Sequence, residues 1–224
     1  MSSVMSDAEF DKALLGAAFT LAGAAGWDAV TAAEAARSAN LDLARARERF
    51  PARTAILLRF GRSADQAALA QAPVEGTVRD RLFYLLMQRI DVMQDHRAGV
   101  LALTRRLPRD PGMALLLACA TRRSMRWLLD AAGVPTAGLR GELRVRGLCG
   151  VWLWVMRAWQ HDETEDMAAT MSALDAALRR AERLAPWLGG ATAHPAPPEA
   201  NANAEAAPEA EPPNSTSPPE ERTR

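Results

Sequence analysis

The sequence contains few of the residues that build disulfide-linked, metal-binding or catalytic proteins. Its two cysteines, Cys119 and Cys149, are far apart and form no CxxC pair, so we expect two reduced thiols rather than a disulfide scaffold. The chain has three histidines, and HExxH, GxSxG, Walker and Rossmann glycine motifs are all missing. These absences disfavour an enzyme, and we expect no catalytic residue, no metal and no other cofactor.

Long apolar runs are also missing. The most apolar stretch, residues 148–156, is about half as long as a membrane span and is followed by Arg157. The first twelve residues include acidic side chains and no apolar run, so we expect no secretory signal. The sequence therefore predicts a cytoplasmic protein without stable membrane association.

Charge is unevenly distributed, although the formal net charge is zero. Residues 190–224 hold eight prolines, six acidic residues and two basic ones, and no aromatic residue, so we expect a disordered tail. Residues 42–62 instead carry six arginines against two acidic residues. This local excess of positive charge is what phosphate binding requires, although a solvated helix face has the same composition.

Outside residues 190–224, apolar side chains recur every three or four positions, which predicts an all-α fold of about nine helices. Thr77, Asp110 and Thr164 have the side chains and positions expected of helix N-caps. The expected helices span residues 8–25, 32–39, 43–50, 53–71, 78–94, 98–107, 111–132, 139–160 and 165–184.

Residues 31–50 have the spacing of a helix-turn-helix. Thr31 and Glu34 match a capping box, in which the threonine hydroxyl and the glutamate carboxylate each accept a backbone N–H. Asn40 suits the left-handed conformation that ends a helix, and Asp42 suits the N-cap of the next one. Two short helices separated by a tight turn are therefore expected.

The second of these helices is rich in arginine and ends before Pro51, in a segment that resembles the DNA-binding domain of TetR-family transcriptional regulators. The matching positions are Gly26, Trp27, Ala29, Thr31, Ala36, Ala39, Leu41, Phe50, Pro51, Ile56 and Leu57. Where the family usually has Ser-Lys-Gly-Thr-Leu-Tyr, residues 42–47 read Asp-Leu-Ala-Arg-Ala-Arg. Basic charge has thus replaced the usual polar contacts.

The resemblance implies a DNA-binding domain at residues 1–60, a helical effector-binding and dimerisation domain at 61–189, and the tail at 190–224. Its DNA-contacting residues are expected to be Thr31, Asp42, Arg45, Arg47, Arg49 and Arg53. Arg45 is expected to reach a base edge, favourably a guanine, while Arg47, Arg49 and Arg53 anchor phosphates.

The longer helices predict a site for a small apolar effector. Apolar side chains of several helices are expected to line a cavity in which methionines adapt to the ligand. The predicted lining residues are Leu86, Met93, Met125, Trp127, Val151, Trp152 and Val155. An ordinary packed core remains the alternative, because helix spacing does not distinguish a filled core from a hollow one.

The last two helices carry more apolar surface than a terminal pair buries alone. In the family this pair forms a four-helix interface with its symmetry mate, which implies a C2 homodimer. The expected interface residues are Cys149, Met156, Trp159, Met167, Met171, Leu174 and Leu178.

Two functions follow from these patterns. The first is a ligand-responsive regulator of repressor type that binds double-stranded operator DNA. The alternative is a TetR-like lipid- or isoprenoid-binding accessory protein of ubiquinone biosynthesis that has lost operator binding, because residues 159–175 also resemble those proteins. No amphipathic membrane-touching helix is expected after Leu184, which favours the regulator.

Overall fold

The computed structural model describes residues 5–73 and 75–184, and within these residues the chain forms α-helices and no strand, which confirms the all-α prediction. The predicted tail at 190–224 lies outside the described residues. The helices are α1 (Asp7–Ala25), α2 (Ala32–Ser38), α3 (Leu43–Arg49), α4 (Arg53–Ala70), α5 (Val78–Gln94), α6 (Arg97–Arg106), α7 (Pro111–Ala131), α8 (Gly138–His161) and α9 (Ala168–Leu184). Short 3-10 helices, η1 (Trp27–Ala29) and η2 (Leu107–Arg109), follow α1 and α6.

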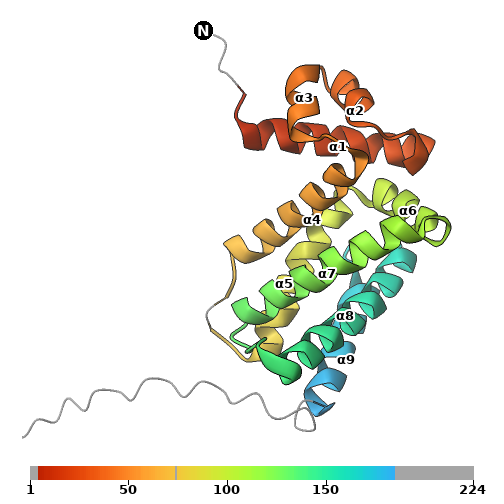
Figure 1. Cartoon of the computed structure of the whole chain (residues 1–224). Helices are drawn as coiled ribbons and strands as arrows, with labels where there is room; N and C mark the ends of the chain where they lie inside the picture. Colours follow the sequence, from red (N-terminus) through yellow and green to blue (C-terminus); the bar gives the residue numbers. More distant parts are fainter. Residues whose placement is uncertain (1–4, 74, 185–224) are drawn as a thin grey trace, which may run out of the picture. The chain divides into compact units, whose positions relative to one another are not determined.

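Helices α1 to α3 form a head, and α4 leads from it into a body made of α5 to α9 (Figure 1). The predicted boundary after residue 60 falls inside α4, so one continuous helix joins the two parts. None of the described helices is long and apolar enough to cross a membrane.

Local signals set the turn between α2 and α3. Asn40 has the expected positive φ of 52°, and the Asp42 carboxylate accepts the Arg45 backbone N–H at 2.7 Å. The Thr31 hydroxyl accepts the Glu34 N–H at 3.1 Å, but the return half of the predicted capping box is wrong. The Glu34 carboxylate pairs instead with Arg37 at 3.0 Å.

The core of the head combines large side chains from α1 with small ones from α2 and α3. Phe10, Phe19 and Trp27 are almost fully buried, and each contributes about 1.5–3 kcal/mol of hydrophobic stabilisation. Ala36 and Ala46 are buried opposite them. Because alanine side chains are short, α2 lies close to α1, and α3 lies close to α2.

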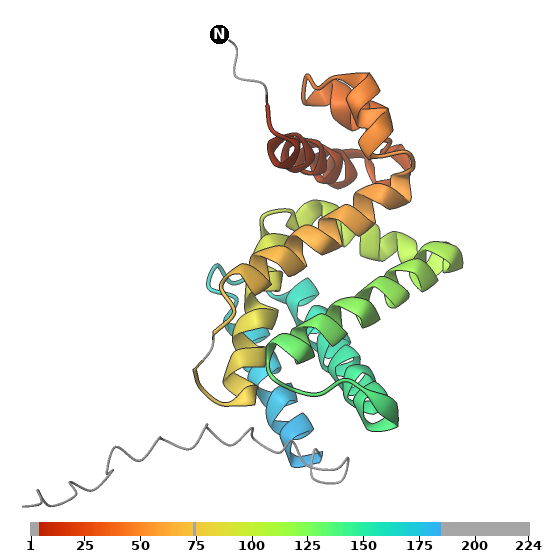
Figure 2. The ribbon, with the colours of Figure 1, turned by 60° about the vertical axis from the view of Figure 1, so that its left-hand side comes forward.

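The head meets the body where α1 crosses α6 (Figure 2). The contact is close because glycines stand at the crossing: a Cβ on Gly99 would lie 2.2 Å from the backbone oxygen of Phe19. A Cβ on Gly23 would lie 2.9 Å from the Cβ of Ala98. The backbones of α1 and α6 therefore lie in direct contact at this crossing.

A buried carboxylate determines where α9 begins. Asp162 is 5% exposed and accepts the Thr170 N–H and hydroxyl, both at 2.7 Å, and the Thr164 hydroxyl at 2.6 Å. Burial raises the pKa of Asp162, but these hydrogen bonds outweigh burial and hold the pKa below its usual value. The helix consequently starts at Ala168, three residues after the predicted start, and Met167 before it has a φ of 53°.

Candidate nucleic-acid interface

Arg45 of α3, predicted to read a base, is bonded to the N-terminal end of α1. Its guanidinium donates to the Met5 carbonyl at 3.0 Å and to the Asp7 carboxylate at 2.5 Å. It also lies 4.5 Å from the centroid of the Phe10 ring. The hydrogen bond from Arg45 and the positive charge of Arg49 lower the pKa of Asp7.

Arg49 is held more firmly, by two carboxylates of α1. Its Nε and Nη2 donate to the two oxygens of Asp11 at 2.6 and 2.8 Å, and its Nη1 lies 2.6 Å from Asp7. Arg59 of α4 adds a contact of 2.8 Å to Asp11. Arg49 therefore links α3 to α1 through donors that are occupied within the protein, and its phosphate contact stays a prediction.

The sequence did not identify Asp7 and Asp11 as partners of these arginines. They precede Arg45 and Arg49 by 38 residues, and nothing in the local pattern indicates the contact. Their effect is to neutralise much of the positive charge that residues 42–62 carry.

Arg53, the first residue of α4, holds the segment before α2. Its Nη1 donates to the Trp27 carbonyl at 3.2 Å and the Asp28 carbonyl at 3.5 Å. The Asp28 carboxylate pairs with Arg106 at 2.8 Å, and this hydrogen bond lowers its pKa. The Arg53 side chain is 35% exposed, so part of its guanidinium remains accessible to a phosphate.

The outward face of α3 has a different composition from its inward face. Leu43 is 46% exposed, and Ala44, Arg47 and Glu48 are exposed beside it. These positions follow i, i+1, i+4 and i+5, so they lie on one side of the helix. We call Leu43, Ala44, Arg47 and Glu48 the free face of α3. The Arg47 guanidinium donates to the Pro51 carbonyl at 2.6 Å and remains at the surface.

The predicted effector cavity is not found at its predicted residues. Leu86, Met125 and Val155 are fully buried, and Trp152 is 5% exposed, so these side chains belong to the packed core. Met93 is partly buried and packs against the same core.

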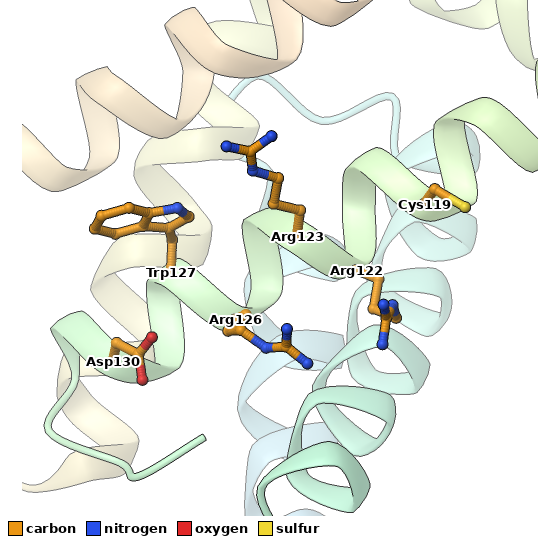
Figure 3. Close-up of a pocket in the computed structure, with 6 residues that line it drawn as sticks. All are labelled: Cys119, Arg122, Arg123, Arg126, Trp127 and Asp130. Carbon is orange, nitrogen blue, oxygen red and sulfur yellow. The ribbon is translucent and has the colours of Figure 1, made fainter. Parts of the chain in front are cut away.

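Trp127 was predicted to line the effector cavity, but its side chain is 58% exposed on the outside of α7. Figure 3 shows it beside Arg123, on one side of α7, with Arg122 and Arg126 on the other. Those two arginines pair with Glu142 at 2.7 Å each. The hollow around Trp127, about 520 Å³, is therefore a charged surface depression and not an apolar cavity.

A larger apolar groove of about 840 Å³ runs along α8 and α9. We call it the outer groove; its lining includes Leu148, Val151, Trp154, Ala173, Ala176 and Leu178. Val151 comes from the predicted effector set and Leu178 from the predicted dimer set. Its lining also includes two exposed small residues of α8, Gly147 and Gly150.

Most residues of the predicted dimer interface are occupied inside the protomer, which corrects that prediction. Trp159 and Leu174 are fully buried, Leu178 and Met156 nearly so, and Cys149 and Met167 are partly buried. Met171 is 36% exposed. Periodicity identified the apolar face of each helix, but that face packs on the protomer's own body.

A buried ion pair that sequence reasoning missed connects the helices of the body. Arg89 of α5 is 6% exposed, pairs with Asp65 of α4 and lies 5.0 Å from the centroid of the Trp152 ring. Ser124 of α7 donates its hydroxyl to Asp65 at 2.5 Å. Among the described residues, Arg89 Nε has no hydrogen-bond acceptor. No group of three or more histidine, cysteine or acidic side chains in the described part of the chain is arranged to hold a metal ion.

Comparison with known proteins gives structural relatives only. No protein-family model matches the chain, and no curated protein matches it. A TetR transcriptional regulator from Nitrosomonas europaea has a TM-score of 0.64 at 21% identity, over 78% of this chain and 98% of that one. A TetR-family transcriptional regulator from Streptomyces coelicolor has a TM-score of 0.55 at 21% identity, over 83% of this chain and 87% of that one. The helix-turn-helix head and the helical body described above together make the TetR-type fold.

Proposed function

We propose that the protein is a DNA-binding transcriptional regulator of the TetR type. The observation that supports this most is the geometry of α3, which is capped by Asp42 and bonded to α1 by Arg45 and Arg49. These contacts fix the orientation of α3 while leaving its free face open to solvent. A rigid helix with one unoccupied face is what major-groove recognition requires.

The phosphate contacts are assigned to arginines that remain accessible. Arg47 lies at the surface and Arg53 is 35% exposed at the start of α4. Arg45 is instead bonded to the Met5 carbonyl and the Asp7 carboxylate, so it is not among them. Thr31 and Asp42 fix the starts of α2 and α3 and present their helix ends to DNA.

Binding-site selection on random duplexes tests this function. The wild-type protein should enrich one sequence as an inverted repeat, because a two-fold dimer places two heads on half-sites about 34 Å apart. Arg47→Ala should bind the enriched sequence more weakly, with a smaller dependence on salt. Enrichment of no sequence would refute the proposal.

We place the dimer interface on the outer face of α8 and α9. Trp154 is 56% exposed there, and Gly147, Ala173 and Ala176 beside it allow a second pair of helices to approach closely. Covering the outer groove with a second copy removes this apolar surface from water.

Size-exclusion chromatography with light scattering tests the interface. Trp154→Glu should convert the dimer into a monomer, because the charge would be buried without a partner. Trp127→Glu is the matched control, since Trp127 is 58% exposed on α7, away from the outer groove. A dimeric Trp154→Glu variant would place the interface elsewhere.

Control by a small apolar effector is the finer part of the proposal. The buried pair of Arg89 and Asp65 links the body to α4, which continues into the head. Any effector that shifts this ion pair would change the position of α4 and hence the fit of α3 to DNA. Asp65→Asn should therefore change the affinity for the selected operator, although residue 65 lies in the body. An unchanged affinity in a folded variant would remove this route of control.

The alternative function is a lipid- or isoprenoid-binding accessory role, which the apolar lining of the outer groove favours. Native mass spectrometry of the purified protein would then show a bound lipid, and selection would enrich no operator. A lipid-free protein with a selected operator would eliminate this alternative.

A further inference from the structure

We propose that α3 reads its operator through thymine methyl groups, contacted by Leu43 and Ala44. This inference rests on the proposed DNA-binding function and adds the chemistry of the bases that are recognised. It differs from the expectation that Arg45 reads a guanine.

The first argument is what the beginning of α3 leaves available. The N-terminal residues of a recognition helix are those that contact base edges. Here the Asp42 carboxylate caps the helix, and the Arg45 guanidinium is bonded to Met5 and Asp7. The side chains left free at this end are those of Leu43, which is 46% exposed, and Ala44.

The second argument is chemical. Leu43 and Ala44 neither donate nor accept hydrogen bonds, so they do not pair with the polar groups of any base edge and match an apolar one. The C5 methyl of thymine is the apolar feature of the major groove. Contact with it also removes the exposed Leu43 side chain from water.

The third argument concerns the rest of the free face. Arg47 and Glu48 lie one turn beyond Leu43 and Ala44, on the same side of α3. Arg47 is exposed and supplies a positive charge for the phosphates that flank the groove. One face of α3 therefore carries apolar side chains for base contacts in its first turn and a positive charge for the DNA phosphates one turn later.

Single replacement of thymine by deoxyuridine in the selected operator tests the inference, because it removes the methyl group and leaves the hydrogen-bonding edge intact. One or two thymines of each half-site should be sensitive. Loss of one contacted methyl should weaken wild-type binding about three- to fivefold, the effect expected for one buried methyl or methylene group. Replacement in both half-sites should multiply the two losses.

Two variants distinguish methyl recognition from general loss of binding. Leu43→Ala should bind the thymine and deoxyuridine operators equally at the position that Leu43 contacts. Arg47→Ala should weaken both operators to the same extent and keep their ratio. Circular dichroism should show both variants folded, since both side chains lie at the surface.

The outcomes separate the inference from the function on which it rests. If selection yields an operator but no thymine is sensitive to loss of its methyl group, the inference fails and the regulator remains. If a sensitive thymine is equally sensitive in Leu43→Ala and Ala44→Gly, the methyl contact belongs to another residue and the inference again fails. If selection yields no operator, the proposed function fails and the inference with it.

Discussion

Replacing Asp11 with asparagine should destabilise the protein strongly, because Asp11 holds two arginines at the junction of α1, α3 and α4. It is 9% exposed and contacts Arg49 at 2.6 and 2.8 Å and Arg59 at 2.8 Å. The amide of asparagine has nearly the same shape but no charge. Arg49, whose side chain is 18% exposed, would keep its ion pair with Asp7 and at most one hydrogen bond to the uncharged amide oxygen.

The size of the effect follows from burial. Hydrogen bonds to charged groups contribute about 1.5–3 kcal/mol each, and removing one partner of a buried pair costs about 3–5 kcal/mol. The site is slightly exposed, so we expect Asp11→Asn to cost about 2–4 kcal/mol in the free energy of unfolding. For a chain of this size the melting temperature should fall by roughly 5–15 °C.

Asp7→Asn is the matched control. Asp7 contacts the same Arg49 at 2.6 Å, but its side chain is 66% exposed, so water replaces the lost contact and the loss should be much smaller. Urea unfolding and thermal melts of both variants give the comparison. Equal, small losses in the two variants would refute the reasoning. Arg49 would then be loosely held and able to anchor a phosphate, the role that the sequence predicts for it.

Three further changes test other contacts. Gly99→Ala should destabilise the protein by several kcal/mol, because the new Cβ would lie 2.2 Å from the backbone oxygen of Phe19 where α1 crosses α6. The control is Gly61→Ala, which has nothing within 4 Å of the new Cβ and should stabilise the protein by about 0.5–1 kcal/mol. A Gly99→Ala variant as stable as the wild type would contradict the close contact of α1 with α6. Asp162→Asn should destabilise the protein at pH 7. Because the pKa of Asp162 is lower in the folded state, its contribution to the free energy of unfolding is present above about pH 4 and is lost as the pH falls through the folded-state pKa. The melting temperatures of variant and wild type should therefore converge in acid. A difference that stays constant with pH would argue that the charge of Asp162 does not stabilise the start of α9. Met125→Ala should lower the free energy of unfolding in urea by about 2–5 kcal/mol and Trp127→Ala by far less, because Met125 is fully buried and Trp127 is 58% exposed. A larger loss for Trp127→Ala than for Met125→Ala would show that Trp127 packs in the interior.

The helices and their caps were predictable because the signals are local. A capping side chain, a left-handed residue such as Asn40 and apolar residues at helical spacing act within a few positions of each other. Two exceptions arise because a side chain has more than one possible partner nearby. Glu34 pairs with Arg37 rather than with the cap, and the start of α9 depends on Asp162, which lies on the other side of the turn.

The candidate site was less predictable, because it depends on contacts distant in sequence. Composition gives six arginines in residues 42–62 but not that Asp7 and Asp11 hold three of them, Arg45, Arg49 and Arg59. Only the fold shows that α3 exposes Leu43 and Ala44 to solvent. Periodicity likewise marked Trp159 and Leu174 as apolar, but it did not show whether they pack inside the protomer or against a second copy.

The outer face of α9 shows a related limit of sequence reasoning. Ala173 and Ala176 line the outer groove, yet alanine carries little weight in a hydrophobic pattern. A surface that depends on small residues for close helix approach is therefore invisible to periodicity.

The ratio of affinities for the selected operator and for a scrambled duplex, measured with the full chain at 0.15 M salt, tests the central claim most directly. A regulator should prefer its operator by at least about a thousandfold. Arg47→Ala should weaken binding to both duplexes and reduce the salt dependence of each. A ratio near one, with binding that salt abolishes equally for both duplexes, would show that α3 does not read sequence and would contradict the account.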